Sequence, residues 1–226
     1  MEHTETERIS IFIDAGNFYH LVLKKLGLNE VEFNFEGFVN FIANGRQIIE
    51  NGKRFYIGTV REKRDGHEST KAMSNQTKLF SELINSGGWV IQTSKLRTRT
   101  EKIKIDDRVV NYQQILKSGI KEVIYKKSRE KGIDVQLAVD LLIDAFDNKY
   151  DTAVIVSSDT DLVPAINVVR NHLGKKVEYI GFSIPMANLY ESTKPTQSMI
   201  GNSDIQRVLV ESDLKPFFKT LFNSQD

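Results

Sequence analysis

The alternation of short apolar runs with amphipathic segments constrains the fold of this chain more than any other feature. The runs are rich in β-branched and aromatic residues, which favour strands. They are Ser10–Asp14, Lys53–Val60, Trp89–Thr93, Thr152–Val156 and Lys176–Gly181. The segments between them repeat apolar residues at helical spacing and are Phe18–Leu26, Glu36–Ala43, Thr70–Ile84, Val135–Phe146 and Leu162–His172. Strands that alternate with helices predict an α/β protein with a parallel central sheet.

Charge and composition narrow the function classes. The 226 residues carry 31 Lys and Arg against 30 Asp and Glu, so any site for a polyanion must be local. The chain has no cysteine, which excludes disulfides, thiolate metal centres and cysteine nucleophiles. No apolar run approaches the ~20 residues of a membrane span, and the polar N-terminus does not resemble a signal peptide. We therefore expect a cytoplasmic protein.

Two stretches fit the alternation less well and set the expected domain limits. Residues 94–129 are polar and charged, and they read as an insertion with a hairpin around Val109–Ile115 and Glu122–Tyr125. The chain after Phe182 is less regular. We expect one domain over residues 1–184, interrupted by an insertion at about 94–129. Residues 185–226 are expected to form an extension that packs on the domain or mediates contacts.

Carboxylates follow two of the predicted strands. Asp14 ends the first strand, and Asp159 and Asp161 follow the fourth in the sequence VSSDTDL. Ligands of open α/β sheets bind at the carboxyl ends of strands. Either Asp14 or one of the later pair could instead cap a helix, but two acids so close in sequence repel each other unless a cation is near.

A further acid, Asp134, precedes the helix predicted over Val135–Phe146. At ~100° per residue it lies on the side of Ala138 and Leu141, which we expect to face the sheet. A carboxylate there is costly to bury unless it is paired or bound to metal. A separate polar stripe is expected to be the solvated face, so that Asp144→Asn should change little; it consists of Gln136, Asp140, Asp144 and Asp147.

Together these positions predict an acidic site at one edge of the sheet. Oxygen ligands suit Mg²⁺ or Mn²⁺, and such ions hold phosphate oxygens and activate water. The chain has no Walker motif. Hydrolysis of a phosphate ester is therefore the expected chemistry.

Three blocks of the sequence resemble the NYN domain, the LabA-like branch of the PIN-related nucleases. They are IFIDAGNFY, KGIDVQLAVDLL and YDTAVIVSSDTDLVPAINVVRNHLGKKVEYIGF, within Ile9–Phe182. The resemblance implies a PIN-like, Rossmannoid three-layer sandwich with strand order 3-2-1-4-5. It also implies that Mg or Mn is bound by Asp14, Asp134, Asp159 and Asp161, with Asn17 as a catalytic supporting residue. Asp140 matches a recurrent acid of such helices, but its place on the helix favours a structural role.

Basic residues run toward the same edge and are candidates for binding RNA. The substrate-binding candidates are Arg61, Arg64, Arg97, Arg99 and Lys131. Basic runs are as often plain solvated surface, although three runs that meet one edge favour a cradle for nucleic acid. Tyr19 and Trp89 are expected in the core rather than as stacking platforms.

The expected function is that of a metal-dependent ribonuclease, in particular an endoribonuclease. One alternative is a DNA nuclease or phosphoesterase that uses the same site. Another is a non-catalytic RNA-binding or regulatory adaptor, and a homo-oligomer is open in each case. The haloacid-dehalogenase phosphatases are disfavoured, because they need a second Asp two residues after the first, where this chain has Gly16.

Overall fold

A six-stranded parallel sheet forms the centre of the protein. The computed structural model describes residues 6–59, 67–95, 97–129 and 132–219. The sheet order is β3-β2-β1-β6-β7-β8, and every neighbouring pair is parallel. The strands are β1 (Arg8–Asp14), β2 (Gln47–Thr59), β3 (Trp89–Lys95), β6 (Thr152–Val156), β7 (Lys176–Ser183) and β8 (Ile205–Val210).

The predicted order 3-2-1-4-5 was not exact, because it lacks the sixth strand. The five predicted strands are β1, β2, β3, β6 and β7, and each is present. The segment Ile205–Val210 adds β8 beside β7, with Glu178 opposite Ile205. Its pattern of mostly exposed residues explains why it did not read as a buried strand.

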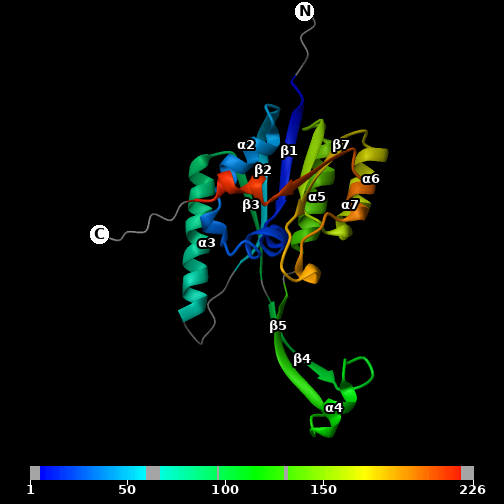
Figure 1. The fold of residues 1–226 in the computed structure, drawn as a ribbon. Helices are drawn as coiled ribbons and strands as arrows, with labels where there is room; N and C mark the ends of the chain where they lie inside the picture. Colours follow the sequence, from blue (N-terminus) through cyan, green and yellow to red (C-terminus); the bar gives the residue numbers. More distant parts are fainter. Residues whose placement is uncertain (1–5, 60–66, 96, 130–131, 220–226) are drawn as a thin grey trace, which may run out of the picture.

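Helices cover both faces of the sheet and give the three layers (Figure 1). One face packs against a core that includes Phe18, Phe38 and Leu79, and the other against one that includes Leu137 and Ile166. The helices and helical turns of the body are α1 (Ala15–Phe18), η1 (Tyr19–Leu23), η2 (Glu30–Glu32), α2 (Phe35–Ala43), α3 (His67–Ser86), α5 (Ile133–Phe146), η3 (Thr160–Leu162), α6 (Val163–Asn171), η4 (Leu189–Glu191), α7 (Gln197–Gly201), α8 (Glu211–Leu214) and η5 (Lys215–Phe217). Of the described helices, none is long and apolar enough to cross a membrane.

The register of the sheet aligns the ends of its central strands. Asp14 lies opposite Tyr56 of β2, and Ile13 lies opposite Val156, the last residue of β6. Because the strands are parallel, the carboxyl ends of β1, β2 and β6 lie at one edge. This edge therefore receives the segments in which most of the candidate site residues occur.

The insertion forms an antiparallel arm that projects from the body (Figure 1). Its strands are β4 (Arg97–Lys104) and β5 (Glu122–Arg129), and α4 (Tyr112–Lys117) lies between them. A hairpin was expected here, but its first strand was misplaced: much of Val109–Ile115 lies in α4 and the turn before it. The charged alternation RTRTEKIK concealed a strand because neither of its faces is apolar.

The expected orientation of α5 was right for Leu141, which is buried, and for Gln136 and Asp147, which are exposed, but wrong for the middle of the polar stripe. Asp140 and Asp144 of the supposed solvated stripe are buried, with 9% and 1% of their surface exposed. Arg54 of β2 forms ion pairs with both. The apolar Ile143 and Phe146 are exposed instead, at 50% and 78%. Helical spacing identifies which residues share a face, but the partner that makes a buried acid tolerable lies on another strand.

Candidate acidic active site

Asp14 lies at the end of β1, where the chain turns into α1. Its side chain is 7% exposed and accepts two hydrogen bonds. The backbone N–H of Asn17 donates to Oδ1 at 2.9 Å, and the Ser157 hydroxyl donates to Oδ2 at 3.0 Å. Burial, followed by repulsion from Asp134 and Asp159, raises the pKa of Asp14 to about 6 against the opposing effect of these hydrogen bonds. Asp14 is thus a helix cap and also a carboxylate held under electrostatic strain.

The turn after β6 holds Asp159 and Asp161. The Asp159 carboxylate accepts a hydrogen bond from the backbone N–H of Asp161 at 2.9 Å and so caps η3. The backbone N–H of Asp159 donates to the Ser157 hydroxyl at 3.1 Å. Since the same hydroxyl donates to Asp14, Ser157 joins the turns that follow β1 and β6.

A second connection between these turns runs through Asn17. Its Oδ1 accepts a hydrogen bond from the backbone N–H of Ser158 at 2.9 Å. The Ser158 hydroxyl lies 2.7 Å from the hydroxyl of Tyr179, a fully buried residue of β7. The backbone N–H of Thr196 donates to the same Tyr179 oxygen at 3.2 Å. Asn17 therefore holds the backbone beside the acids by a hydrogen bond, and Tyr179 holds the Ser158 side chain of the same turn.

Asp134 lies in the first turn of α5 and is more open to solvent than Asp14. Its pKa is raised by partial burial, then by repulsion from Asp159 and Asp161. The expectation that it faces the sheet was wrong, since its side chain is exposed. It nevertheless faces the acids of the β6 turn closely enough for their charges to interact.

The four acids are therefore electrostatically coupled, but they are not arranged as a closed set of ligands. Asp14 interacts with Asp134 and Asp159, and Asp134 also interacts with Asp161. Within the described residues, however, no three acidic or histidine side chains come close enough together to hold a metal ion as they stand. The all-oxygen donor set of the four acids fits Mg²⁺ or Mn²⁺, and like charges at this spacing are eased by a cation.

Comparison with known proteins identifies the family to which this chain belongs. The sequence profile of the NYN domain matches residues 8–197, which include all four acids and Asn17. The chain belongs to the NYN domain family. This NYN domain has the nuclease-like α/β fold of its relatives, with the acids at the carboxyl edge of the sheet.

Two individual proteins show how far the likeness extends. The chain is 37% identical over 192 residues to the 6-hydroxy-3-succinoylpyridine 3-monooxygenase HspA of Pseudomonas putida. That match covers 77% of this chain and 59% of the relative. The crystal structure of VPA0982, a protein of unknown function from Vibrio parahaemolyticus, superposes with a TM-score of 0.53 at 17% identity, over 92% of this chain and 96% of that one. The second likeness concerns the fold alone.

The candidate RNA-binding residues of this NYN domain fall into two groups. Arg61, Arg64 and Lys131 lie outside the described residues. Arg97 and Arg99 lie on β4, where they pair in register with Arg129 and Lys127 of β5. This end of the arm follows β3 and precedes α5, so it joins the body at the edge where the acids lie.

Sequence reasoning missed several residues of this edge. Tyr179 holds the turn after β6 through the Ser158 hydroxyl, and it gave no signal because its strand also contains the polar Lys176 and Glu178. Ser157, a residue open to a turn role or a phosphate contact from the sequence, joins that turn to Asp14. Tyr19, which was expected in the core, is only half-buried and lines a pocket with Glu30 and Asn75. Nothing in the sequence indicates that pocket, because its walls come from four separated segments.

Proposed function

We propose that this NYN domain is a metal-dependent ribonuclease, in particular an endoribonuclease that hydrolyses phosphodiester bonds at the Asp14 edge. The observation that carries the proposal is that Asp14 and Asp159 follow the neighbouring parallel strands β1 and β6 and are joined through Ser157. Asp134 lies near enough for Asp159 and Asp161 to raise its pKa. A cluster of uncompensated carboxylates destabilises a protein, so a bound cation is the simplest reason to keep one. NYN domains are generally nucleases.

The four acids would hold Mg²⁺ or Mn²⁺. When bound, such an ion would shield the charge of the phosphodiester and activate the attacking water. Ser157 fixes the Asp14 carboxylate and the β6 turn at once, through its two hydrogen bonds. Asn17 holds the backbone of Ser158 and leaves its amide nitrogen available to the substrate. The cations of β4 and β5 would bind the phosphates of the strand on either side of the cut.

Incubation of single-stranded RNA, single-stranded DNA and a chromogenic phosphodiester with Mn²⁺, with and without EDTA, tests this function. We expect EDTA-sensitive cleavage within RNA, and loss of that cleavage in Asp134→Asn. Asp107→Asn is the matched control, since Asp107 is an exposed acid beyond β4. Cleavage of DNA or of the chromogenic ester alone would assign the site to the alternative hydrolases. RNA binding without any cleavage would assign the domain to the adaptors.

A second candidate function comes from the P. putida relative. HspA is named for oxygenation of a hydroxypyridine, and it is 37% identical to this chain. The chain spans 59% of that protein, so the match does not include all of the relative. Oxygen consumption in the presence of a 6-hydroxypyridine and a reduced nicotinamide, unaffected by EDTA, would favour this function over hydrolysis.

A further inference from the structure

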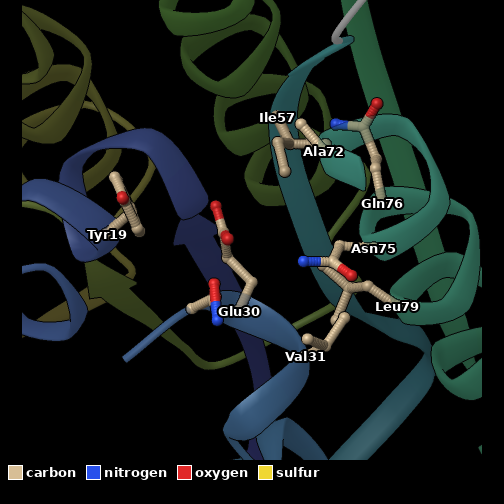
Figure 2. Close-up of a pocket in the computed structure, with 9 residues that line it drawn as sticks. Tyr19, Glu30, Val31, Ile57, Ala72, Asn75, Gln76 and Leu79 are labelled. Atoms are coloured by element: carbon tan, nitrogen blue, oxygen red, sulfur yellow. The ribbon is translucent and has the colours of Figure 1, made fainter. Parts of the chain in front are cut away.

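A pocket of about 240 Å³ lies beside the acidic edge, on the face of the sheet covered by α3. Figure 2 shows it between the η1 and η2 segments on one side and α3 on the other, with the end of β2 behind. Val31, Ile57 and Leu79 supply apolar walls. Glu30 and Asn75 supply polar groups from opposite sides, and Tyr19 closes one end.

The chain connects this pocket directly to the acidic site. Ile57 follows Tyr56, which lies opposite Asp14 in the sheet register. Tyr19 follows Asp14 through the single turn of α1. A polynucleotide whose phosphate lay at Asp14 would therefore have the pocket within reach of a neighbouring nucleoside.

Some polar side chains of the pocket have hydrogen-bond partners within the protein, and others do not. The Gln76 amide nitrogen donates to the carbonyl of Gly58 at 2.9 Å, and the Asn29 amide nitrogen donates to Glu32 at 2.6 Å. By contrast, no described side chain donates a hydrogen bond or forms an ion pair with the Glu30 carboxylate. Burial raises its pKa, opposed only by its own backbone N–H and the charge of His20.

Asn75 is the second unengaged group. It is half-buried on α3, and within the described residues its amide has no hydrogen-bond partner. Figure 2 shows the Glu30 carboxylate extending between Tyr19 and Ile57 and the Asn75 side chain projecting toward the same space. The pocket therefore presents a carboxylate that accepts hydrogen bonds opposite an amide that donates them, between apolar walls.

We propose that this pocket binds the lactam edge of a planar nitrogen heterocycle. Glu30 accepts the ring N–H, and Asn75 donates to the adjacent ring C=O. Guanine and uracil carry this edge, and so does a free hydroxypyridine in its pyridone form. Adenine and cytosine present a bare ring nitrogen there, which a carboxylate repels. Guanine adds an exocyclic amine that can donate to the second carboxylate oxygen, so it should bind best.

As a base pocket for RNA the inference rests on the proposed function, but its test does not require catalysis. Titration calorimetry in EDTA would measure binding of the four nucleoside 5′-monophosphates and of 6-hydroxynicotinate. Two well-made hydrogen bonds to a base give roughly tenfold or greater discrimination. We expect GMP and UMP to bind more tightly than AMP and CMP by about that factor.

Two variants and a control make the assignment specific. Glu30→Gln should remove the preference for GMP and UMP, and Asn75→Asp should weaken both by placing a second acceptor opposite the ring C=O. Glu50→Gln, an exposed acid near the start of β2, should leave the preference unchanged. Equal binding of the four nucleotides and no binding of 6-hydroxynicotinate would overturn the proposal, as would an unchanged preference in both pocket variants with native thermal melts.

The outcome also distinguishes a base of RNA from a free heterocycle as the ligand, and the pocket proposal from the nuclease proposal. Glu30-dependent binding of 6-hydroxynicotinate alone would keep the chemistry of the pocket and assign it to a free heterocycle. Glu30-dependent binding of GMP with no metal-dependent cleavage of any RNA would refute the nuclease and support the pocket. Metal-dependent cleavage of RNA without preference for guanine or uracil next to the cut, together with equal affinities for the four nucleotides, would support the nuclease and refute the pocket.

Discussion

The body and the arm of this protein handle charge in opposite ways. In the body, Asp140 and Asp144 are buried against Arg54, while the apolar Ile143 and Phe146 of the same helix are exposed. In the arm, Arg97 pairs in register with Arg129, and Arg99 with Lys127. Like charges directly across a strand pair are destabilising, and a two-stranded ribbon is marginally stable by itself. The body thus uses charge pairs inside its packing, whereas the backbone register of the arm places basic residues opposite one another.

The acidic edge shares one feature with the body and one with the arm. Its carboxylates are held by backbone and hydroxyl hydrogen bonds, but Asp134 and Asp159 also raise the pKa of Asp14 by charge repulsion. Charges that stabilise a fold are paired with opposite charges, whereas charges that bind a ligand are left without a partner in the free protein.

The largest expected effect is on the stability of the body. Asp144→Asn should lower the free energy of unfolding by about 3 kcal/mol, the lower end of the range for breaking a buried ion pair, because Arg54 keeps its ion pair with Asp140. The Asp144 side chain is 2% exposed, and that of Arg54 is 13% exposed. Urea denaturation measures the loss.

Asp147→Asn is the matched control on the same helix end. Asp147 is 47% exposed and pairs with Lys149 at 3.4 Å, so its loss should cost less than about 1 kcal/mol. Equal stabilities of the two variants would show that the Arg54–Asp144 ion pair does not stabilise the body. The contrast between a body stabilised by charge pairs and the arm would then be wrong.

The next effect concerns chemistry. Asp159→Asn should reduce Mn²⁺-dependent RNA cleavage by more than about a hundredfold, because loss of residues that merely support metal ligands already costs about 10–100-fold. The fold should persist, since an Asn carbonyl can still accept the hydrogen bond from Asp161. Without metal, the variant should melt at the same or a higher temperature, because repulsion on Asp14 falls.

Single-turnover cleavage and thermal melts in EDTA would check both statements. Asp107→Asn, an exposed acid of the insertion, should leave turnover unchanged. Full activity of Asp159→Asn would remove it from the catalytic set and leave it as a cap of η3 alone.

The contrast also explains what could be predicted from sequence. The buried runs of the sheet were identified because residues covered on both faces read as continuous apolar strands, as Thr152–Val156 does. The acidic edge followed from strand ends and from the resemblance to NYN domains. Strand β8 escaped, because a half-exposed edge strand has no such pattern.

What could not be predicted depends on contacts between distant segments. Asp144 was assigned to solvent because nothing local reveals that Arg54, 90 positions earlier in the chain, would pair with it. The pocket at Glu30 is invisible for the same reason, since its walls come from η1, η2, β2 and α3. Periodicity indicates which residues share a face; the packing partner decides whether a polar face is buried or exposed.

A smaller effect is expected at the base of the arm. Replacing Arg97 and Arg99 together by Gln should weaken binding of single-stranded RNA of any sequence. The slope of log K against log salt should flatten by roughly 0.7 for each lost phosphate contact. The rate at saturating RNA should change little, because the acidic edge is untouched. Fluorescence anisotropy over a series of salt concentrations measures the slope, and an unchanged slope would make these arginines plain surface.

The smallest effect is expected farther along the same strand. Lys102 lies on the same strand as these arginines, but it forms an ion pair with Glu122 across the arm. Both side chains are about half exposed, so the pair contributes at most about 1 kcal/mol, and its cation is already neutralised. Lys102→Gln should therefore leave the salt slope within error of the wild type, while Glu122→Gln, which frees the lysine, should steepen it slightly. A flattening in Lys102→Gln equal to that of one arginine would show that RNA displaces Glu122, and that the cationic surface extends along the whole arm rather than being confined to its base.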